Sequence, residues 1–423
     1  MSTDASRLLR EGEALVRKRD FRAARDALSQ AVAMVPALAP AHSLLGRARH
    51  GLGDAGGAAE SYRAALDLDP RDADAWRRFG NALLDLERPA EAADAFRRAR
   101  ALNPRDSGSV YGLGTALAEA DDVEGAEAAF TEWGHLPPPA SLDPHLHFAA
   151  IAGQIRLSDG FFAGLDTGPG PALDGSFAQG DAPLVFVAAD AGYTARFVDL
   201  IAGNLAAQAP GIALHLHVVN PTAESEAKVA RVADLTQGHL DLAVTRETVG
   251  LARYAAPGLD PLYAAKTYYS CARFLALPQL VAHYRRPILV CDIDLAPTRD
   301  PRPWLDELAP CDAGANVKIR YDFANRLLAT MVYFGDTPAG RRYAGLVSAY
   351  CRHFLEDRTA TWTIDQVALH AAWLHMRRQG QWNDFREFAP GTMNWMDDSF
   401  DAEEARRRFL FVSLYSSVPK AGG

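Results

Sequence analysis

Two aspartates one residue apart are the side chains best suited to chemistry. In "RRPILVCDIDLAPTRD", Asp292 and Asp294 end an apolar run. On an extended segment, residues two apart point to the same side, so both carboxylates would face one way while Ile293 points into the core. Mg²⁺ or Mn²⁺ is typically held by one or two carboxylates together with substrate diphosphate oxygens. The pair therefore suggests a metal site for a nucleotide-diphosphate donor.

Asp-x-Asp is also common in solvated loops, so the elements that would position it decide its meaning. From Pro183 onward, apolar strand-like runs alternate with helical patterns, which is typical of a mainly parallel sheet covered by helices. Ligands of such sheets bind beyond the carboxyl ends of the strands, where Asp190, Asp292 and Asp294 fall. Strands are predicted over 183–190, 212–220, 287–294, 311–317, 327–335 and 408–415, and helices over 194–208, 223–235, 264–284, 340–355 and 363–378.

Two other kinds of metal-ligating residue lack a supporting pattern. His215 and His217 alternate on a predicted strand, and we interpret them as the polar side of a solvent-facing edge, because spacing alone specifies little. The cysteines lie far apart without a CxxC pair, which favours small core residues over a zinc or redox site. They are Cys271, Cys291, Cys311 and Cys351.

The first third of the chain repeats every 34 residues. Proline and glycine recur in one register, at Pro36, Pro70, Pro104 and Pro138, and at Gly12, Gly46, Gly80 and Gly114. Small and large residues alternate in the same register: Ala24, Ala58, Ala92 and Ala126, then Leu28, Tyr62, Phe96 and Phe130, then Ala31, Ala65 and Ala99. An ordinary amphipathic bundle has no reason to repeat side-chain size at one long period, so this pattern indicates a helical repeat array.

The pattern resembles the tetratricopeptide repeat, a helix–turn–helix unit in which small residues let paired helices approach and proline ends the second helix. The resemblance implies an α-solenoid of four repeats over 1–140, whose concave face binds a protein partner or an extended peptide. Glu11 and Trp133 depart from the usual residue sizes, in terminal repeats that cap the stack. Gly/Pro-rich stretches predict a linker over 141–181 and a second domain over 182–423. Between these stretches, "HLHFAAIAGQIRL" suggests one further helix packed on the last repeat.

Composition limits the compartment and the partners. The 423 residues carry a formal charge of −9, with a pI near 5.8, so a phosphate backbone or an anionic membrane is disfavoured as the main partner. The N-terminal segment lacks the apolar core of a signal peptide, and no stretch reaches the roughly 18 apolar residues of a membrane span. We expect a cytoplasmic protein with no membrane span and no nucleic-acid partner.

The second domain resembles the GT-A glycosyltransferases, particularly glycosyltransferase family 8, across about residues 183–420. "VFVAADAGYTARFVDLIAGNL" is similar to the family's opening strand. By that resemblance Asp190 and Tyr193 would bracket the nucleotide base. "WTIDQVALHAA" is similar to the family's Asp-Gln helix. It implies catalytic roles, with Asp365 against the donor sugar and Gln366 near the anomeric carbon.

The stretch between these motifs carries the charged part of the resemblance. "YYSCARFLALPQLV" followed by "RRPILVCDID" is similar to the family's Tyr-x-Arg-Leu helix leading into its metal-binding DxD. The resemblance implies that Arg273 contacts the donor, that Lys266 adds positive charge there, and that Asp292 and Asp294 bind Mn²⁺ or Mg²⁺. The expected fold is thus a Rossmann-like α/β GT-A domain, and the expected donor is a UDP-sugar.

Two stretches depart from the family's pattern. Where the family usually has Asn-Ala-Gly or Asn-Ser-Gly after the DxD, residues 328–330 are Leu, Ala and Thr. In the family's C-terminal His-x-x-Gly-x-x-Lys-Pro pattern, Leu414 replaces the histidine that completes metal coordination, and Ser417 replaces the glycine. Only Lys420, expected to contact the donor, remains of that pattern. These departures leave the third metal ligand open.

The sequence thus supports two hypotheses of different classes. The first is a metal-dependent glycosyltransferase, retaining as family 8 members are, whose repeats present a protein or glycan acceptor. The second is a transferase-like scaffold that has lost activity and acts through protein–protein interaction, as the missing histidine would allow.

Overall fold

The computed structural model describes residues 3–137, 148–168, 170–254, 261–318, 320–389, 391–394, 404 and 407–413. The chain divides into two units, the first comprising Met1–Ser158 with Ile319–Phe323 and the second Asp159–Lys318 with Ala324–Gly423. None of the helices in the described ranges has the length and apolar content needed to cross a bilayer.

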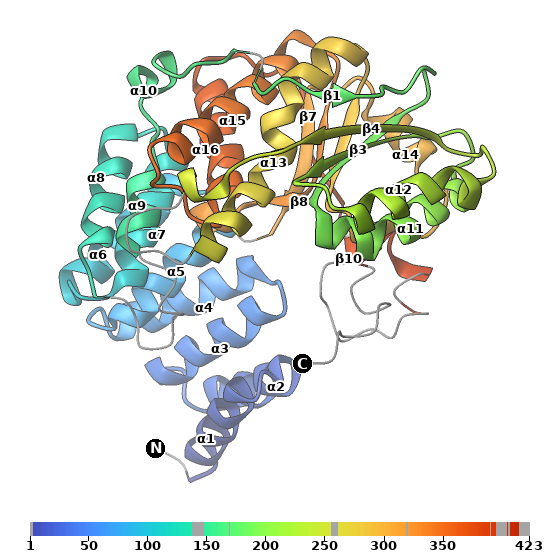
Figure 1. The fold of residues 1–423 in the computed structure, drawn as a ribbon. Coiled ribbons are helices and arrows are strands. Elements are labelled where there is room, and N and C mark those ends of the chain that lie inside the picture. The colour runs from blue at the N-terminus through green and yellow to red at the C-terminus, as the bar shows by residue number, and fades with distance from the viewer. Residues whose placement is uncertain are drawn as a thin grey trace. The chain divides into compact units, whose positions relative to one another are not determined.

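The first unit consists of paired antiparallel helices, as the 34-residue period predicts (Figure 1). The glycines and large residues of the repeat pack against each other, so that a Cβ on Gly46, Gly80 or Gly114 would lie 2.7–2.8 Å from the ring of Tyr62, Phe96 or Phe130. Helix pairing therefore depends on the absence of a glycine side chain. The pairs are α1 (Thr3–Arg17) and α2 (Phe21–Met34), α3 (Ala39–Gly51) and α4 (Ala55–Leu68), α5 (Ala73–Asp85) and α6 (Pro89–Leu102), and α7 (Ser107–Glu119) and α8 (Val123–Gly134).

The turn between the two helices of each pair also recurs in the 34-residue register. A residue with positive φ occurs at the same register in every pair, namely at Arg19, Gly53, Glu87 and Asp121. The next residue is an aspartate in three of the four pairs, and its carboxylate caps the following helix, as Asp54 does for the Gly57 N–H at 2.9 Å. Such caps satisfy N–H groups that the helix itself leaves without an acceptor.

The segment predicted as a linker contains regular structure on both sides of the unit boundary. Helix α9 (Phe148–Gln154) packs on the last repeat through Ile151 and Trp133. Helix α10 (Asp159–Ala163) belongs to the second unit, where Phe162 stacks on His375 at 4.2 Å between ring centroids. Strand β1 (Asp174–Gly175) lies at the edge of the main sheet.

The second unit is an α/β domain built on an eight-stranded sheet of order β1-β4-β3-β2-β5-β8-β7-β9 (Figure 1). The adjacent strands β4, β3, β2 and β5 run parallel, whereas β8 is antiparallel to both β5 and β7. The expected mainly parallel sheet is thus mixed. The remaining strands are β2 (Leu184–Asp190), β3 (Ala213–Val219), β4 (Asp241–Glu247), β5 (Ile288–Cys291), β7 (Ala313–Val317), β8 (Leu327–Phe334) and β9 (Phe385–Glu387), with β6 (Leu295–Pro297), β10 (Met393–Asn394) and β11 (Phe411–Ser413) in a small second sheet.

Helices cover both faces of this sheet. Helices α11 (Ala191–Gln208) and α12 (Ala223–Thr236) bury apolar side chains against one face. On the other, α13 (Pro261–Tyr284), α15 (Pro338–Glu356) and α16 (Ile364–Arg378) pack on one another and on the strands (Figure 1). The shorter helical segments are α14 (Arg302–Leu308) and the 3₁₀ turns Leu251–Tyr254 and Phe323–Asn325.

This covering corrects the interpretation of His215 and His217. Both lie on β3, an inner strand, and their exposed fractions are 0% and 1%, so they do not form a solvent-facing edge. The two histidines do lie on the same face of the strand, as their spacing of two predicts. Periodicity cannot show, however, that this polar face lies under a helix. The prediction that all four cysteines are buried is confirmed.

Candidate functional site

A cavity of about 480 Å³ in the second unit brings together the predicted site residues. Strand β2, helix α13, the turn after β5 and the start of α16 each contribute to its wall. The ninth predicted residue, Lys420, lies outside the described residues, as do Leu414 and Ser417. The eight that line the cavity are Asp190, Tyr193, Lys266, Arg273, Asp292, Asp294, Asp365 and Gln366.

The two DxD aspartates reach this cavity from a turn. Strand β5 ends at Cys291, and the Leu295 N–H donates to the Asp292 carbonyl at 3.1 Å, so the predicted extended geometry is wrong. Ile293 nevertheless points inward and is 3% exposed. Burial, and then the neighbouring charge of Asp292, raise the pKa of Asp294 to about 6. The cavity therefore disfavours the ionised form of Asp294 beside Asp292.

Arg273 lies between two of the acidic groups. It is 6% exposed on α13, so it is not a surface charge of that helix. Its guanidinium hydrogen-bonds the Asp292 carboxylate and lies 3.3 Å from that of Asp365. Burial raises the pKa of Asp365 to about 6, while Arg273 opposes this shift. Arg273 thus links the predicted metal-binding segment to the predicted catalytic helix.

Asp190 and Tyr193 lie where β2 meets α11. The Asp190 carboxylate accepts hydrogen bonds from the N–H groups of Gly192 at 2.7 Å and Tyr193 at 3.0 Å, so it caps α11. Tyr193 is 43% exposed and lines the cavity. Lys266 is also exposed and places an ammonium group at the same cavity.

Several buried polar atoms around the cavity have no hydrogen-bond partner among the described residues. They are Arg273 Nε, Thr363 Oγ1 and Gln366 Oε1. Each such atom costs about 1–3 kcal/mol when left unsatisfied. The residues of the cavity wall thus include three polar atoms that the described part of the chain leaves without a partner.

The residues that depart from the family's pattern do form part of the wall. Leu328, Ala329 and Thr330 line the cavity, and the Thr330 carbonyl accepts a hydrogen bond from the Asp292 N–H at 2.9 Å. For the metal, Asp292 and Asp294 are suitable hard-oxygen ligands facing one cavity. Within the described ranges, however, no group of three His, Cys, Asp or Glu side chains gathers at one point.

Sequence reasoning missed several residues of this wall: Tyr269, Ser270, Lys318, Asn325, Trp362 and Thr363. Tyr269 and Ser270 precede Arg273 by four and three positions, so the helical period alone places all three on one side of α13. Trp362, which is 57% exposed, directly precedes the Asp-Gln helix. Lys318 and Asn325 carry no such signal, because they follow β7 and precede β8 in an irregular segment.

Comparison with known proteins identifies the repeats. Residues 9–75 and 77–140 match the family described as Tetratricopeptide repeat, which places the match wholly in the first unit. A MamA crystal structure is 25% identical, with 31% of this chain and 73% of that chain covered at a TM-score of 0.30. YrrB, "a TPR protein with an unusual peptide-binding site", is 20% identical, with coverages of 35% and 76% and a TM-score of 0.31. No curated protein matches the chain.

Proposed function

We propose that the second unit is a GT-A-type glycosyltransferase domain that moves a sugar from a nucleotide-diphosphate sugar, with UDP-sugars as the first candidates, to an acceptor hydroxyl. The observation that supports this best is that residues from separate motifs lie around one cavity. These motifs are spread between Asp190 and Gln366, and the same cavity wall contains polar atoms without partners among the described residues. A chance assignment of separate surface residues would not bring them together.

Each part of the cavity then has a role. Tyr193 packs on the base, and Lys266 and Arg273 attract the diphosphate. In the transfer, the acceptor oxygen bonds to the anomeric carbon as the bond from that carbon to the diphosphate breaks, and the hydroxyl proton passes to the departing diphosphate. Gln366 uses its unsatisfied Oε1 to position the donor sugar, and Asp365 holds Arg273 in place.

The metal expected from the resemblance would be held by Asp292 and Asp294. When bound, Mn²⁺ or Mg²⁺ neutralises charge on a departing diphosphate. The Arg273–Asp292 contact means that Asp292 must exchange or share its partner when a cation binds. The cation would also remove the like-charge repulsion that contributes to the raised pKa of Asp294.

The repeats supply the second half of the function. Tetratricopeptide repeats imply a protein-interaction role, and we propose that they recruit the acceptor protein or a partner that carries the acceptor.

A thermal-shift screen tests the donor assignment. UDP-glucose, UDP-galactose and UDP-N-acetylglucosamine, each with and without MnCl₂, should raise the melting temperature of the full chain only when donor and metal are both present. A donor that shifts the parent is then tested for hydrolysis. Binding with hydrolysis supports the transferase, whereas no shift by any nucleotide sugar contradicts it.

One observation favours the scaffold as a second candidate. Arg273 neutralises Asp292, and a third metal-ligating side chain is not found among the residues described. In that case the domain would bind nucleotide sugars weakly or not at all, and the protein would act through its repeats. Donor binding without any turnover would support this candidate over the first.

A further inference from the structure

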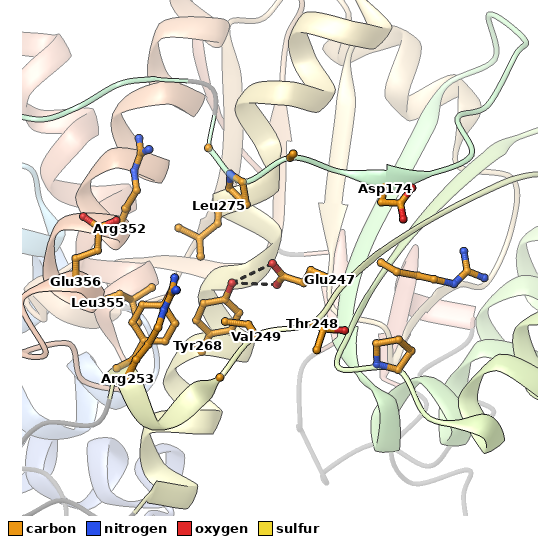
Figure 2. A pocket seen from close by; sticks show the side chains of 17 residues that line it. Asp174, Glu247, Thr248, Val249, Arg253, Tyr268, Leu275, Arg352, Leu355 and Glu356 are labelled. Carbon is orange, nitrogen blue, oxygen red and sulfur yellow. Dashed lines mark hydrogen bonds between the residues drawn. The ribbon is translucent and has the colours of Figure 1, made fainter.

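A second and larger cavity lies in the same unit. It encloses about 790 Å³, within the roughly 300–1,000 Å³ typical of ligand sites. Its wall comes from the end of β4, the 3₁₀ turn Leu251–Tyr254, one side of α13, the end of α15 and the segment before β1 (Figure 2). None of the eight residues of the first cavity lines it. Tyr268 faces this cavity and Tyr269 the other, so α13 contributes to both walls.

The carboxylate of Glu247 is the best-positioned polar group in this cavity. Figure 2 shows it beside Tyr268, whose hydroxyl lies 3.0 and 3.1 Å from its two oxygens. The Nε2 atom of His217 also lies 3.4 Å from Oε1 of this carboxylate. The Glu247 side chain is 12% exposed. It is therefore held in one orientation, with limited access from the cavity.

A buried polar chain supports Glu247 from behind. His217 Nδ1 lies 2.9 Å from Thr245 Oγ1, which lies 2.9 Å from His215 Nε2, and His215 Nδ1 lies 2.7 Å from the hydroxyl of Tyr284. Burial lowers the pKa of His215 to about 3, so that residue is neutral at pH 7. Such a network is expensive to bury unless every member is paired, and here it serves to orient one carboxylate at a cavity.

Most of the positive charge around the cavity is already neutralised. Arg246 makes a two-pronged contact with Glu226, at 2.8 Å for each pair of atoms. Arg352 donates to the carbonyls of Asp166 and Gly168 and lies 3.4 Å from the Asp166 carboxylate. Neither arginine is therefore well placed to attract a phosphate or another anion.

The wall as a whole carries three carboxylates and three guanidinium groups, so its formal charges balance. Glu247, Glu356 and Asp174 offer carboxylate oxygens, and besides the two paired arginines the exposed guanidinium of Arg253 offers donors (Figure 2). An ammonium group would satisfy the carboxylates but would be repelled by Arg253. Hydroxyl groups both donate and accept hydrogen bonds, and Val249, a half-buried residue of the wall, suits the apolar C–H face of a sugar ring.

We propose that this cavity is a binding site for a neutral saccharide, with Glu247 as its principal hydrogen-bond acceptor. The proposal does not rest on the transferase function, because its test is binding alone and needs neither donor nor metal.

The test is binding of maltose, cellobiose, lactose and N,N′-diacetylchitobiose to the full chain, by saturation-transfer NMR and calorimetry. Glucose 1-phosphate and trilysine serve as anionic and cationic comparators. Glu247→Gln keeps the side-chain shape and should weaken binding at least tenfold. Gly250→Phe should abolish binding, since Gly250 lines the cavity and has open space at its Cβ position. Gly345→Phe, also with open space but outside the cavity, should bind like the parent.

The expected result is that at least one disaccharide binds the parent and the Gly345→Phe control, that Glu247→Gln binds it at least tenfold more weakly, and that Gly250→Phe does not bind it. Thermal unfolding of each variant establishes that it is folded. If Glu247→Gln does not fold, Gly250→Phe decides alone. The proposal is overturned if no disaccharide binds the parent, if Gly250→Phe binds as tightly as the parent, or if either comparator binds in preference to the disaccharides.

Discussion

The repeats and the first cavity treat their buried side chains in opposite ways. In the repeats, Gly80 leaves room for Phe96, and the two shapes complement each other at every turn of the array. In the cavity, the buried Oε1 of Gln366 has no hydrogen-bond partner among the described residues, and Asp294 is held in an environment that disfavours its charge. Elements that only pack satisfy their steric and hydrogen-bonding requirements within the protein. A ligand site leaves some of these requirements unmet, and the bound ligand then meets them. Substitutions in the repeats and in the first cavity can each test this contrast.

The largest effect is expected in the repeats. Gly80→Leu places a Cβ 2.7 Å from the ring of Phe96, inside a contact that cannot relax without separating α5 from α6. Overpacking of this kind costs about 3 kcal/mol, at the upper end of the usual range. Circular dichroism should show a destabilised first unit. Gly153→Leu, in α9 where the Cβ position is open, is the matched control, and an equal loss there would contradict the packing argument.

The difference between the two regions also explains what the sequence could reveal. The repeat is readable because side-chain size recurs at a fixed period, and its turns and caps follow the same register. Strand β4 was missed because only Ala243, Val244 and Thr245 of its seven residues are buried and its ends are charged. The antiparallel strand β8 is apolar throughout, so its pattern does not encode its direction.

The two cavities also differ in how far the sequence predicts them. Motifs located the first cavity because Asp292, Arg273 and Asp365 each belong to a recognisable stretch. The second cavity draws on five separate segments, and its central carboxylate, Glu247, ends the strand that sequence patterns missed. The pairing of Glu247 with Tyr268 depends on tertiary packing of α13, which no spacing along the chain expresses.

A second prediction tests whether the unsatisfied atom in the first cavity is functional. Gln366→Ala should slow transfer or donor hydrolysis about 100-fold, with little change in nucleotide affinity, because the group acts mainly in the transition state. Single-turnover rates beside a nucleotide titration measure both quantities. Gln30→Ala, on the exposed side of α2, is the control and should change neither. An unchanged rate in Gln366→Ala would remove this residue from the proposed mechanism.

A third prediction concerns the charge held in the first cavity. The folded-state pKa of Asp294 is about 6, compared with its ordinary value of 3.8. Between these values the folded state binds more protons than the unfolded state, so this group's contribution to stability falls as pH rises from about 4 to 6. Asp294→Asn removes that loss. In EDTA, the variant should gain about 1–3 kcal/mol over the parent between pH 4.5 and 7.5.

Urea unfolding of both proteins at several pH values measures this difference. Asp300→Asn provides a control of opposite sign, because Arg302 lowers the pKa of Asp300 through a hydrogen bond. The Asp300 variant should lose a little stability relative to the parent as pH rises, and the exposed pair makes that effect small. A stability difference for Asp294→Asn that does not change with pH would show that its charge is not disfavoured in the folded protein.

The smallest effect belongs to an unsatisfied atom in the repeats, Tyr62 Oη. The tyrosine is fully buried at the repeat position that holds Phe96 and Phe130 in the next two repeats. Tyr62→Phe should therefore leave the unfolding free energy unchanged or raise it by up to about 1 kcal/mol, because a buried hydroxyl without a partner only loses its hydration. In the first cavity, removing an unsatisfied atom should instead cost activity.

Tyr343→Phe is the control for this prediction. The Tyr343 hydroxyl donates to the Leu369 carbonyl at 2.9 Å, so removing the hydroxyl should cost about 1 kcal/mol of unfolding free energy. If Tyr62→Phe were the more destabilising of the two, the repeats would also hold a polar group that requires a partner.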